Sequence, residues 1–190
     1  MPRDGQSTRA RLVQAASHLF YREGISGVSV DAVAAKAGVT KRTLYYHFSS
    51  KDDLVAAYLE ARDQPNLALM AQWYREASGG PAAKVEAIFR NLAQSARHPK
   101  WRGCAFLRTI AELASMPGHP ARKAGARHKR AFEAWLAAEL AAASSPEALA
   151  RQIVILLDGA FAASLTHRDA AYVEAAGEAA RKLVALALAR

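Results

Sequence analysis

The segment from Thr40 to Lys51 concentrates side chains that can bind nucleic acid. Lys41 and Arg42 can reach guanine edges or phosphates, and the Thr43 hydroxyl can hydrogen-bond a base or touch a thymine methyl. No Asp or Glu occurs between residues 40 and 50, where a carboxylate would repel phosphate. The side chains that we expect to meet DNA are Ser29, Thr40, Lys41, Arg42, Thr43, Tyr45, Tyr46, His47 and Lys51.

The other members of this set suit contacts to the nucleic-acid backbone. Tyr45, Tyr46 and His47 can donate hydrogen bonds to phosphates or pack on sugars, and we expect at least one tyrosine to face the core instead. Ser29 and Lys51 lie near the starts of two predicted helices, where free backbone N–H groups favour an anion. These residues are therefore expected mainly to position the protein on the DNA, not to read its sequence.

Three short helices are predicted to carry these residues. Apolar residues recur at helical spacing over residues 8–22, and a second helix begins after the N-cap Ser29 and ends at Gly38. Thr40 can cap a third helix, in which Leu44 faces inward. A turn of this length containing Gly is typical of a helix-turn-helix, which binds DNA.

A long run of these residues resembles the signature of the TetR family of regulators, and the close likeness covers residues 8–58. The matching positions are Val30-Asp31-Ala32-Val33-Ala34, Ala37-Gly38-Val39-Thr40, Thr43-Leu44-Tyr45-Tyr46-His47-Phe48 and Lys51-Asp52-Asp53-Leu54. The resemblance implies a two-fold dimer, commonly a repressor that a small molecule releases from DNA. It implies base contacts from Lys41, Arg42, Thr43 and Tyr45, and phosphate contacts from Ser29, Tyr46, His47 and Lys51. Asp31 departs from members that carry a basic residue there.

Composition favours an all-α, globular protein with a polyanionic partner. Of the 190 residues 52% are hydrophobic, with Ala and Leu abundant, which favours helix over strand. The 26 Lys and Arg exceed the 17 Asp and Glu, and the net charge of +9 attracts nucleic acid. The first 51 residues hold eight of these cations against three acids. We expect about nine helices: a DNA-binding head, residues 1–50, on an effector-binding and dimerisation body, residues 51–190.

The sequence also favours a cytoplasmic location without a membrane partner. The N-terminus lacks the apolar stretch of a signal peptide, and the longest strongly apolar run, residues 153–157, is too short to span a bilayer. The single cysteine, Cys104, cannot form an internal disulfide or a thiolate cluster, which fits a reducing compartment.

The body is predicted to bind a small organic effector. A fourth helix should begin after Ser50, which with Asp53 has capping-box form, and Pro65 should kink or split it. An aromatic and Met lining suits an apolar or aromatic effector, although the same residues would be ordinary core in any helical domain. The expected lining is Met70, Trp73, Phe89, Cys104, Leu107, Ile110, Glu112, His128, Phe132, Trp135 and Asp158.

The polar residues of this lining have structural alternatives. Glu112 and His128 are expected nearest the pocket. Asp158 needs a partner, for which Arg62 or Arg108 is available, and a structural ion pair is favoured over a role in the pocket.

The sequence gives little support for catalysis or metal binding. Glu112, His119 and His128 lack a compact ligand spacing, so no metal and no cofactor are expected. Common catalytic motifs, such as Gly-x-Ser-x-Gly and His-Glu-x-x-His, are missing, so we do not expect an enzyme. Two alternatives stay open: a sequence-neutral DNA-binding protein, which would need broad basic faces, and a transcriptional activator of the same fold.

The last two predicted helices, residues 146–166 and 169–189, are expected to form a homodimer. Their apolar faces include Leu149, Ile153, Leu156, Ala160, Leu165, Tyr172, Ala176, Leu183 and Leu186. With a two-fold copy they would form a four-helix interface in which small residues such as Gly177 allow close approach, unless they only cover their own monomer's core. The operator should then be a near-palindrome, and an effector would change the spacing of the heads by shifting the helix that begins at Lys51.

Overall fold

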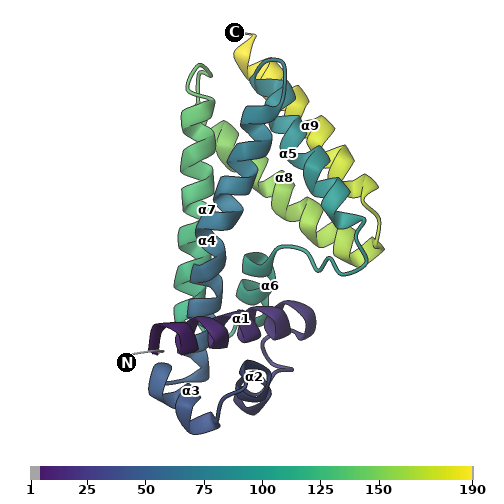
Figure 1. Cartoon of the computed structure of the whole chain (residues 1–190). Coiled ribbons are helices and arrows are strands. Elements are labelled where there is room, and N and C mark those ends of the chain that lie inside the picture. The colour runs from purple at the N-terminus through teal and green to yellow at the C-terminus, as the bar shows by residue number, and fades with distance from the viewer. Residues whose placement is uncertain (1–4, 190) are drawn as a thin grey trace. The chain divides into compact units, whose positions relative to one another are not determined.

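The computed structural model describes residues 5–189, and every regular element in that range is a helix (Figure 1). The helices are α1 (Gly5–Glu23), α2 (Val30–Ala37), α3 (Lys41–His47), α4 (Lys51–Glu76), α5 (Pro81–Ala96), α6 (Ala105–Glu112), α7 (Pro120–Glu139), α8 (Pro146–His167) and α9 (Ala171–Leu188). The expected all-α fold of about nine helices is confirmed. Arg3 and Asp4, which enter the charge count above, lie outside the described residues.

Local signals begin and end the N-terminal helices where the sequence predicts. The Ser29 hydroxyl accepts a hydrogen bond from the N–H of Ala32, and the Thr40 hydroxyl accepts one from Thr43, each at 3.1 Å. Both are N-caps that satisfy free backbone donors. Gly38 ends α2 at φ +66°, a left-handed conformation that favours glycine, and it thereby turns the chain into α3.

The chain divides into two compact units, and each unit combines two segments. Unit 1 holds the chain up to Gln64 together with Ala105–Ala126, and unit 2 holds Pro65–Cys104 together with the chain from Arg127 onward. This division does not follow the predicted boundary after residue 50, because the first part of α4 and helix α6 pack with the three N-terminal helices. The functional division at that boundary stays a prediction.

Unit 1 is built around a core to which all three N-terminal helices contribute. Its fully or almost fully buried side chains include Leu12, Ala16, Phe20, Val33, Leu44, Phe48, Leu54 and Tyr58. The rings of Phe20 on α1 and Tyr58 on α4 meet edge to face, with their centroids 5.6 Å apart. The orientation of α3 is therefore fixed by packing of its inward side chains against α1 and α2, as its pattern predicts.

Unit 2 is organised around α9, which packs on both α5 and α8. A Cβ atom at Gly177 would lie 2.6 Å from the Cβ of Phe89, so α5 and α9 approach closely only because this residue is glycine. Gly177 is therefore committed within its own chain, and its expected role in an interface between two chains is wrong. Leu149 and Ile153 are also buried within the monomer.

Two further expectations change in the structure. Helix α4 continues through Pro65 as one helix, so the predicted split does not occur. By length and composition, helix α8 is long and apolar enough to cross a membrane, with a mean hydropathy of 1.5, which differs from the expectation based on its short apolar run at residues 153–157. One such helix is weak evidence for a membrane, since 44% of an apolar 18-residue stretch of α8 is buried in the protein.

Candidate nucleic-acid interface

Helix α3 presents a polar and aromatic surface above a buried apolar base. Leu44 is completely buried, whereas Arg42, Tyr45 and Tyr46 are exposed. The guanidinium of Arg42 makes no hydrogen bond or ion pair with any other residue between 5 and 189. Its five donors are therefore free for a base edge or a phosphate.

Both tyrosines of α3 face outward. Tyr45 is 44% exposed and Tyr46 is 84% exposed, so the expectation that at least one of them packs in the core is wrong. The ring of Tyr46 meets the half-buried ring of His47 edge to face, with centroids 5.1 Å apart. The seven-residue helix keeps its inward contacts through other residues and leaves both phenol groups accessible to a ligand.

Lys41 is held by a carboxylate of the preceding helix. Its Nζ lies 2.9 Å from Oδ2 of Asp31, and both side chains are largely exposed. The hydrogen bond from Lys41 to Asp31, together with the charge of Asp31, raises the pKa of the Lys41 ammonium above its ordinary value. Lys41 thus stays charged at neutral pH, but contact with DNA would require it to exchange Asp31 for a base or phosphate.

The turn between α1 and α2 is fixed by two side chains from other helices of unit 1. Lys51, the first residue of α4, donates from Nζ to the carbonyl oxygen of Ile25 at 2.6 Å. The two carboxylate oxygens of Glu112, at the end of α6, accept hydrogen bonds from the backbone N–H groups of Ile25 at 2.9 Å and Ser26 at 2.5 Å. The turn is thereby connected to both α4 and α6.

This contact changes the interpretation of Glu112. Partial burial of the carboxyl raises its pKa, but the hydrogen bonds from Ile25 and Ser26 and the nearby charge of Arg108 act in the opposite direction and leave the pKa below its ordinary value. The carboxylate holds the α1–α2 turn, and its expected place among the polar groups nearest an effector pocket stays a prediction.

Replacing Glu112 by Gln is expected to destabilise the protein by roughly 1 kcal/mol at neutral pH, because the negative charge and one of the two acceptor oxygens are lost at an exposed site. Because the folded-state pKa is lowered, the contribution of the carboxylate is fully present above the pKa of the unfolded chain and is lost as the pH falls through the folded-state pKa. Urea unfolding should therefore show a difference between wild type and Glu112→Gln at neutral pH that disappears in acid.

Glu23→Gln is the matched control, since Glu23 is exposed and lies in the same unit. Faster amide hydrogen exchange at Ile25 and Ser26 in Glu112→Gln would locate the effect at the turn. Equal stability of Glu112→Gln and wild type at neutral pH would contradict the role assigned to this carboxylate.

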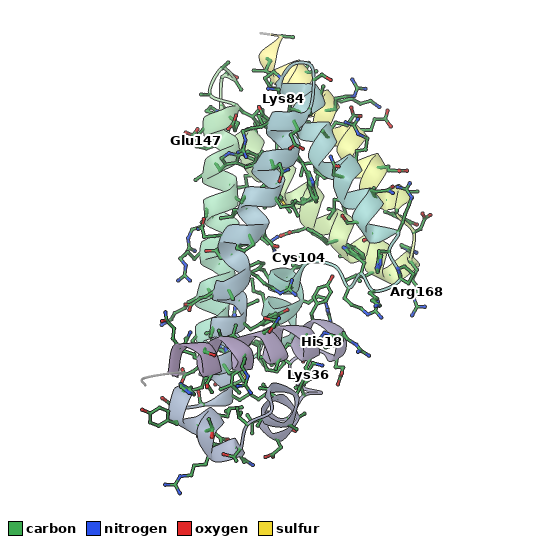
Figure 2. The ribbon with its side chains drawn as sticks, in the orientation of Figure 1. His18, Lys36, Lys84, Cys104, Glu147 and Arg168 are labelled. Carbon is green, nitrogen blue, oxygen red and sulfur yellow. The ribbon has the colours of Figure 1, made fainter. Side chains whose placement is uncertain are left out.

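Helices α1 and α2 form a basic groove that the sequence did not predict. It has a volume of about 380 Å³ and is bordered by Arg11, His18 and Lys36, and Figure 2 labels the last two on their helices. Arg11 is fixed there by a hydrogen bond of 2.5 Å to the carbonyl oxygen of Ala37. The cationic types were visible in the sequence, but only the packing of α1 on α2 brings them together.

The residues predicted to line an effector pocket are distributed over both units. Leu107, Ile110 and Glu112 belong to unit 1, and the other eight belong to unit 2. Asp158 pairs with Lys129 on α7, so neither of its two expected partners is correct. Arg62 lies instead over the rings of Tyr21 and Tyr58.

Other members of the predicted lining serve the core of unit 2. Trp135 contacts the rings of Tyr74 and Phe132, with centroids 5.5 and 5.6 Å away. Phe89 and Phe132 are buried. The ordinary-core interpretation therefore accounts for these aromatic residues, and their contribution to a pocket stays a prediction.

Two of the three side chains considered as metal ligands, His119 and Glu112, contact other residues. Nε2 of the buried His119 lies 3.2 Å from Oδ1 of Asp52, and Glu112 holds the α1–α2 turn. Between residues 5 and 189 no three His, Cys, Asp or Glu side chains are grouped so that they could hold a metal ion.

Known proteins match this chain either over its N-terminal helices alone or over most of its length. The family model described as bacterial regulatory proteins, tetR family, matches residues 12–58. The transcriptional regulator AcuR of Cereibacter sphaeroides is 30% identical over 167 residues, which cover 83% of this chain and 76% of AcuR. The regulator SrpR of Pseudomonas putida is 37% identical over 62 residues, and this chain spans only 29% of its length.

Solved structures match over nearly the whole chain. A TetR-family regulator from Streptomyces coelicolor has a TM-score of 0.82 and 34% identity, covering 95% of this chain and 96% of its own. A regulator from Streptomyces avermitilis has a TM-score of 0.83 and 31% identity, covering 96% and 98%. The likeness thus includes the body as well as the helix-turn-helix.

Proposed function

The chain belongs to the TetR family of transcriptional regulators, and we propose that it is a repressor that binds a near-palindromic operator as a homodimer and is released by a small organic effector. The observation that carries the DNA-binding part is the surface of α3, where Arg42, Tyr45 and Tyr46 are exposed above the buried Leu44. This is the arrangement that a recognition helix needs to enter a major groove.

The proposed contacts fall into two groups. Lys41, Arg42, Thr43 and Tyr45 are proposed to read bases, and the free guanidinium of Arg42 supports this most directly. Phosphate contacts are proposed for the remaining predicted residues, namely Ser29, Thr40, Tyr46, His47 and Lys51. The Lys51 ammonium has three N–H donors, and its hydrogen bond to the carbonyl oxygen of Ile25 uses one of them. The other two can donate to a phosphate.

The proposed homodimer uses the outer faces of α8 and α9. Ile155 is 64% exposed and Leu186 is 62% exposed, although both side chains are large and apolar. A shallow groove of about 200 Å³ is bordered by Leu186 itself, together with Leu183 on α9 and Gln152 on α8. Exposed apolar surface on two adjacent helices supports burial by a second copy.

Release by an effector is proposed to act through the α1–α2 turn. Glu112 at the end of α6 and Lys51 at the start of α4 both hold this turn, so a displacement of either helix would reach the head. The effector must bind the released conformation more tightly than the DNA-bound one to do so. From the Met and aromatic content of the body we propose an apolar or aromatic molecule, and from the family a cytoplasmic protein.

The first experiment is selection of bound DNA from a random library, followed by competition binding. We expect an enriched near-palindrome, and a Lys41→Ala, Tyr45→Ala variant that binds it about tenfold to a hundredfold more weakly, because each lost base contact removes discrimination. Lys123→Ala, at an exposed position of α7, is the charge-matched control for Lys41 and should bind like wild type.

The outcome also separates the alternatives. Absence of any enriched sequence, with equal competition by unrelated DNA, would favour a sequence-neutral binder. An enriched operator at which the protein raises transcription of a reporter would favour an activator of the same fold.

A further inference from the structure

We propose that unit 2 binds a small organic anion in a cavity formed by the chain between α5 and α6 and the turn between α8 and α9. The cavity has a volume of about 500 Å³, within the range of small-molecule sites. The cavity is bordered by charged and aromatic side chains, namely Arg97, His98, Trp101, Arg102, Arg168 and Asp169. None of them belongs to the predicted effector lining, and the proposal does not depend on DNA binding.

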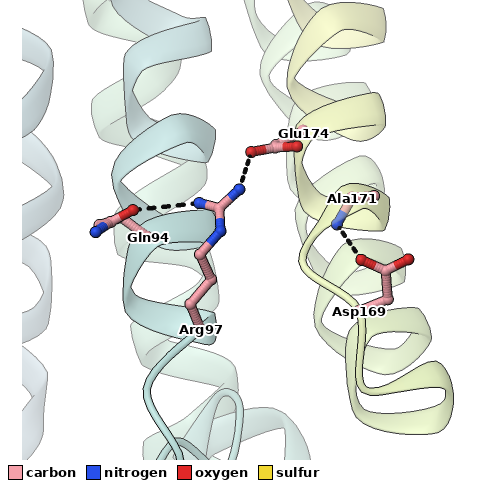
Figure 3. Close-up of polar contacts among 5 residues, drawn as sticks. All are labelled: Gln94, Arg97, Asp169, Ala171 and Glu174. Atoms are coloured by element: carbon pink, nitrogen blue, oxygen red, sulfur yellow. Dashed lines mark hydrogen bonds and ion pairs between the residues drawn. The ribbon is translucent and has the colours of Figure 1, made fainter.

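Arg97 is held in place by its own neighbours. This residue caps the C-terminus of α5, and its guanidinium contacts Gln94 on that helix at 3.2 Å and Glu174 on α9 at 2.5 Å (Figure 3). These contacts use two of its five donors and fix the plane of the group. A fixed guanidinium with spare donors loses little entropy when it binds a carboxylate.

Arg168 contributes a cation that is not engaged within the protein. It caps α8 at φ +52° and is the one non-glycine residue between 5 and 189 with a positive φ. Figure 2 labels Arg168 at the end of α8. Its side chain makes no hydrogen bond or ion pair with another described residue. A left-handed conformation favours glycine or asparagine, so an arginine there, with no partner of its own, supports a binding role for this side chain.

The remaining charged groups leave the cavity cationic. The guanidinium of Arg102 donates to the carbonyl oxygens of Pro99 and Trp101, each at 2.8 Å, which holds its charge at the wall. Asp169 is the carboxylate that borders the cavity, and its Oδ1 accepts from the N–H of Ala171 at 2.8 Å. Three arginines therefore border the cavity against two carboxylates that already have partners, Asp169 with Ala171 and Glu174 with Arg97, which leaves a net positive charge.

The uncharged part of the wall indicates an organic rather than an inorganic anion. The half-buried ring of Trp101 stacks on Phe161, with centroids 6.2 Å apart, which fixes an aromatic surface at the cavity. Nδ1 of His98 accepts a hydrogen bond from the N–H of Lys100 at 3.1 Å, so a neutral His98 ring carries its proton on Nε2 as a further donor. A ligand with a carboxylate on a planar apolar body would bind the arginines through its charge and the Trp101 ring through its apolar face.

Isothermal titration of the full chain with benzoate, benzamide and inorganic phosphate tests this site. Benzoate should bind, with an affinity that falls on addition of salt, whereas benzamide, which has the same ring without the charge, and phosphate, which lacks the ring, should each bind at least about tenfold more weakly. Arg168→Gln should weaken benzoate by about tenfold without affecting the fold, since the side chain has no partner to lose.

Arg90→Gln, which removes the same charge from an exposed position of α5 outside the cavity, is the matched control and should change benzoate affinity by less than about twofold. The site would be overturned by the absence of benzoate binding at millimolar concentration, by equal binding of benzamide or phosphate, or by equal effects of Arg90→Gln and Arg168→Gln.

Discussion

A protein with Ile155→Glu and Leu186→Glu is expected to be monomeric and to bind the selected operator at least about a hundredfold more weakly than wild type. Both side chains are more than half exposed in the single chain, and in the proposed dimer both would be buried. A carboxylate placed there would lose its hydration without gaining a partner, which costs several kcal/mol for each ion. A single head would then have to bind one half-site without the second contact that makes the two-site interaction strong.

Sedimentation and operator titration of the same samples measure both parts of this prediction. A matched control is Ala68→Glu with Ala138→Glu, which adds the same charge at exposed positions of α4 and α7. This control should remain dimeric and retain operator binding apart from a small uniform loss from the added negative charge. A wild-type protein that sediments as a monomer, or a variant with the two α8 and α9 substitutions that stays dimeric, would show that these faces do not form the dimer.

Replacing Leu44 by Ala is expected to lower the free energy of unfolding by about 2–5 kcal/mol and to abolish operator binding. Leu44 has no exposed surface, and α3 has only seven residues, too few to be helical in isolation. The recognition surface therefore exists only while this side chain and Phe48 pack in the core of unit 1. Urea unfolding followed by circular dichroism measures the loss, and hydrogen exchange locates it.

Tyr46→Ala is the informative partner for this variant. Tyr46 is 84% exposed, so its replacement should change the stability by less than about 0.5 kcal/mol while it weakens DNA binding. The two variants thus separate the support of α3 from its contact with DNA. A loss of stability below about 1 kcal/mol in Leu44→Ala would mean that the packing of α3 is less important than its burial indicates.

The sequence by itself determined the helical elements of the head and the surface that they present. Ser29, Thr40 and Gly38 act within a few residues of their own positions, since a cap or a left-handed turn needs only the adjacent backbone. The inward direction of Leu44 also follows from helical spacing. These local features, together with the family resemblance, were sufficient to predict the fold, and the DNA-binding role of the surface stays a prediction.

Only the tertiary structure decided which distant groups meet. Glu112 and Ile25 are 87 residues apart, and Asp158 meets Lys129 rather than either expected arginine. The cavity beside Arg168 likewise joins the end of α5 to the α8–α9 turn. Composition shows that a buried or half-buried charge needs a partner, but many partners satisfy that requirement equally well. The choice among them depends on how the apolar faces of the helices pack, which no short stretch of sequence specifies.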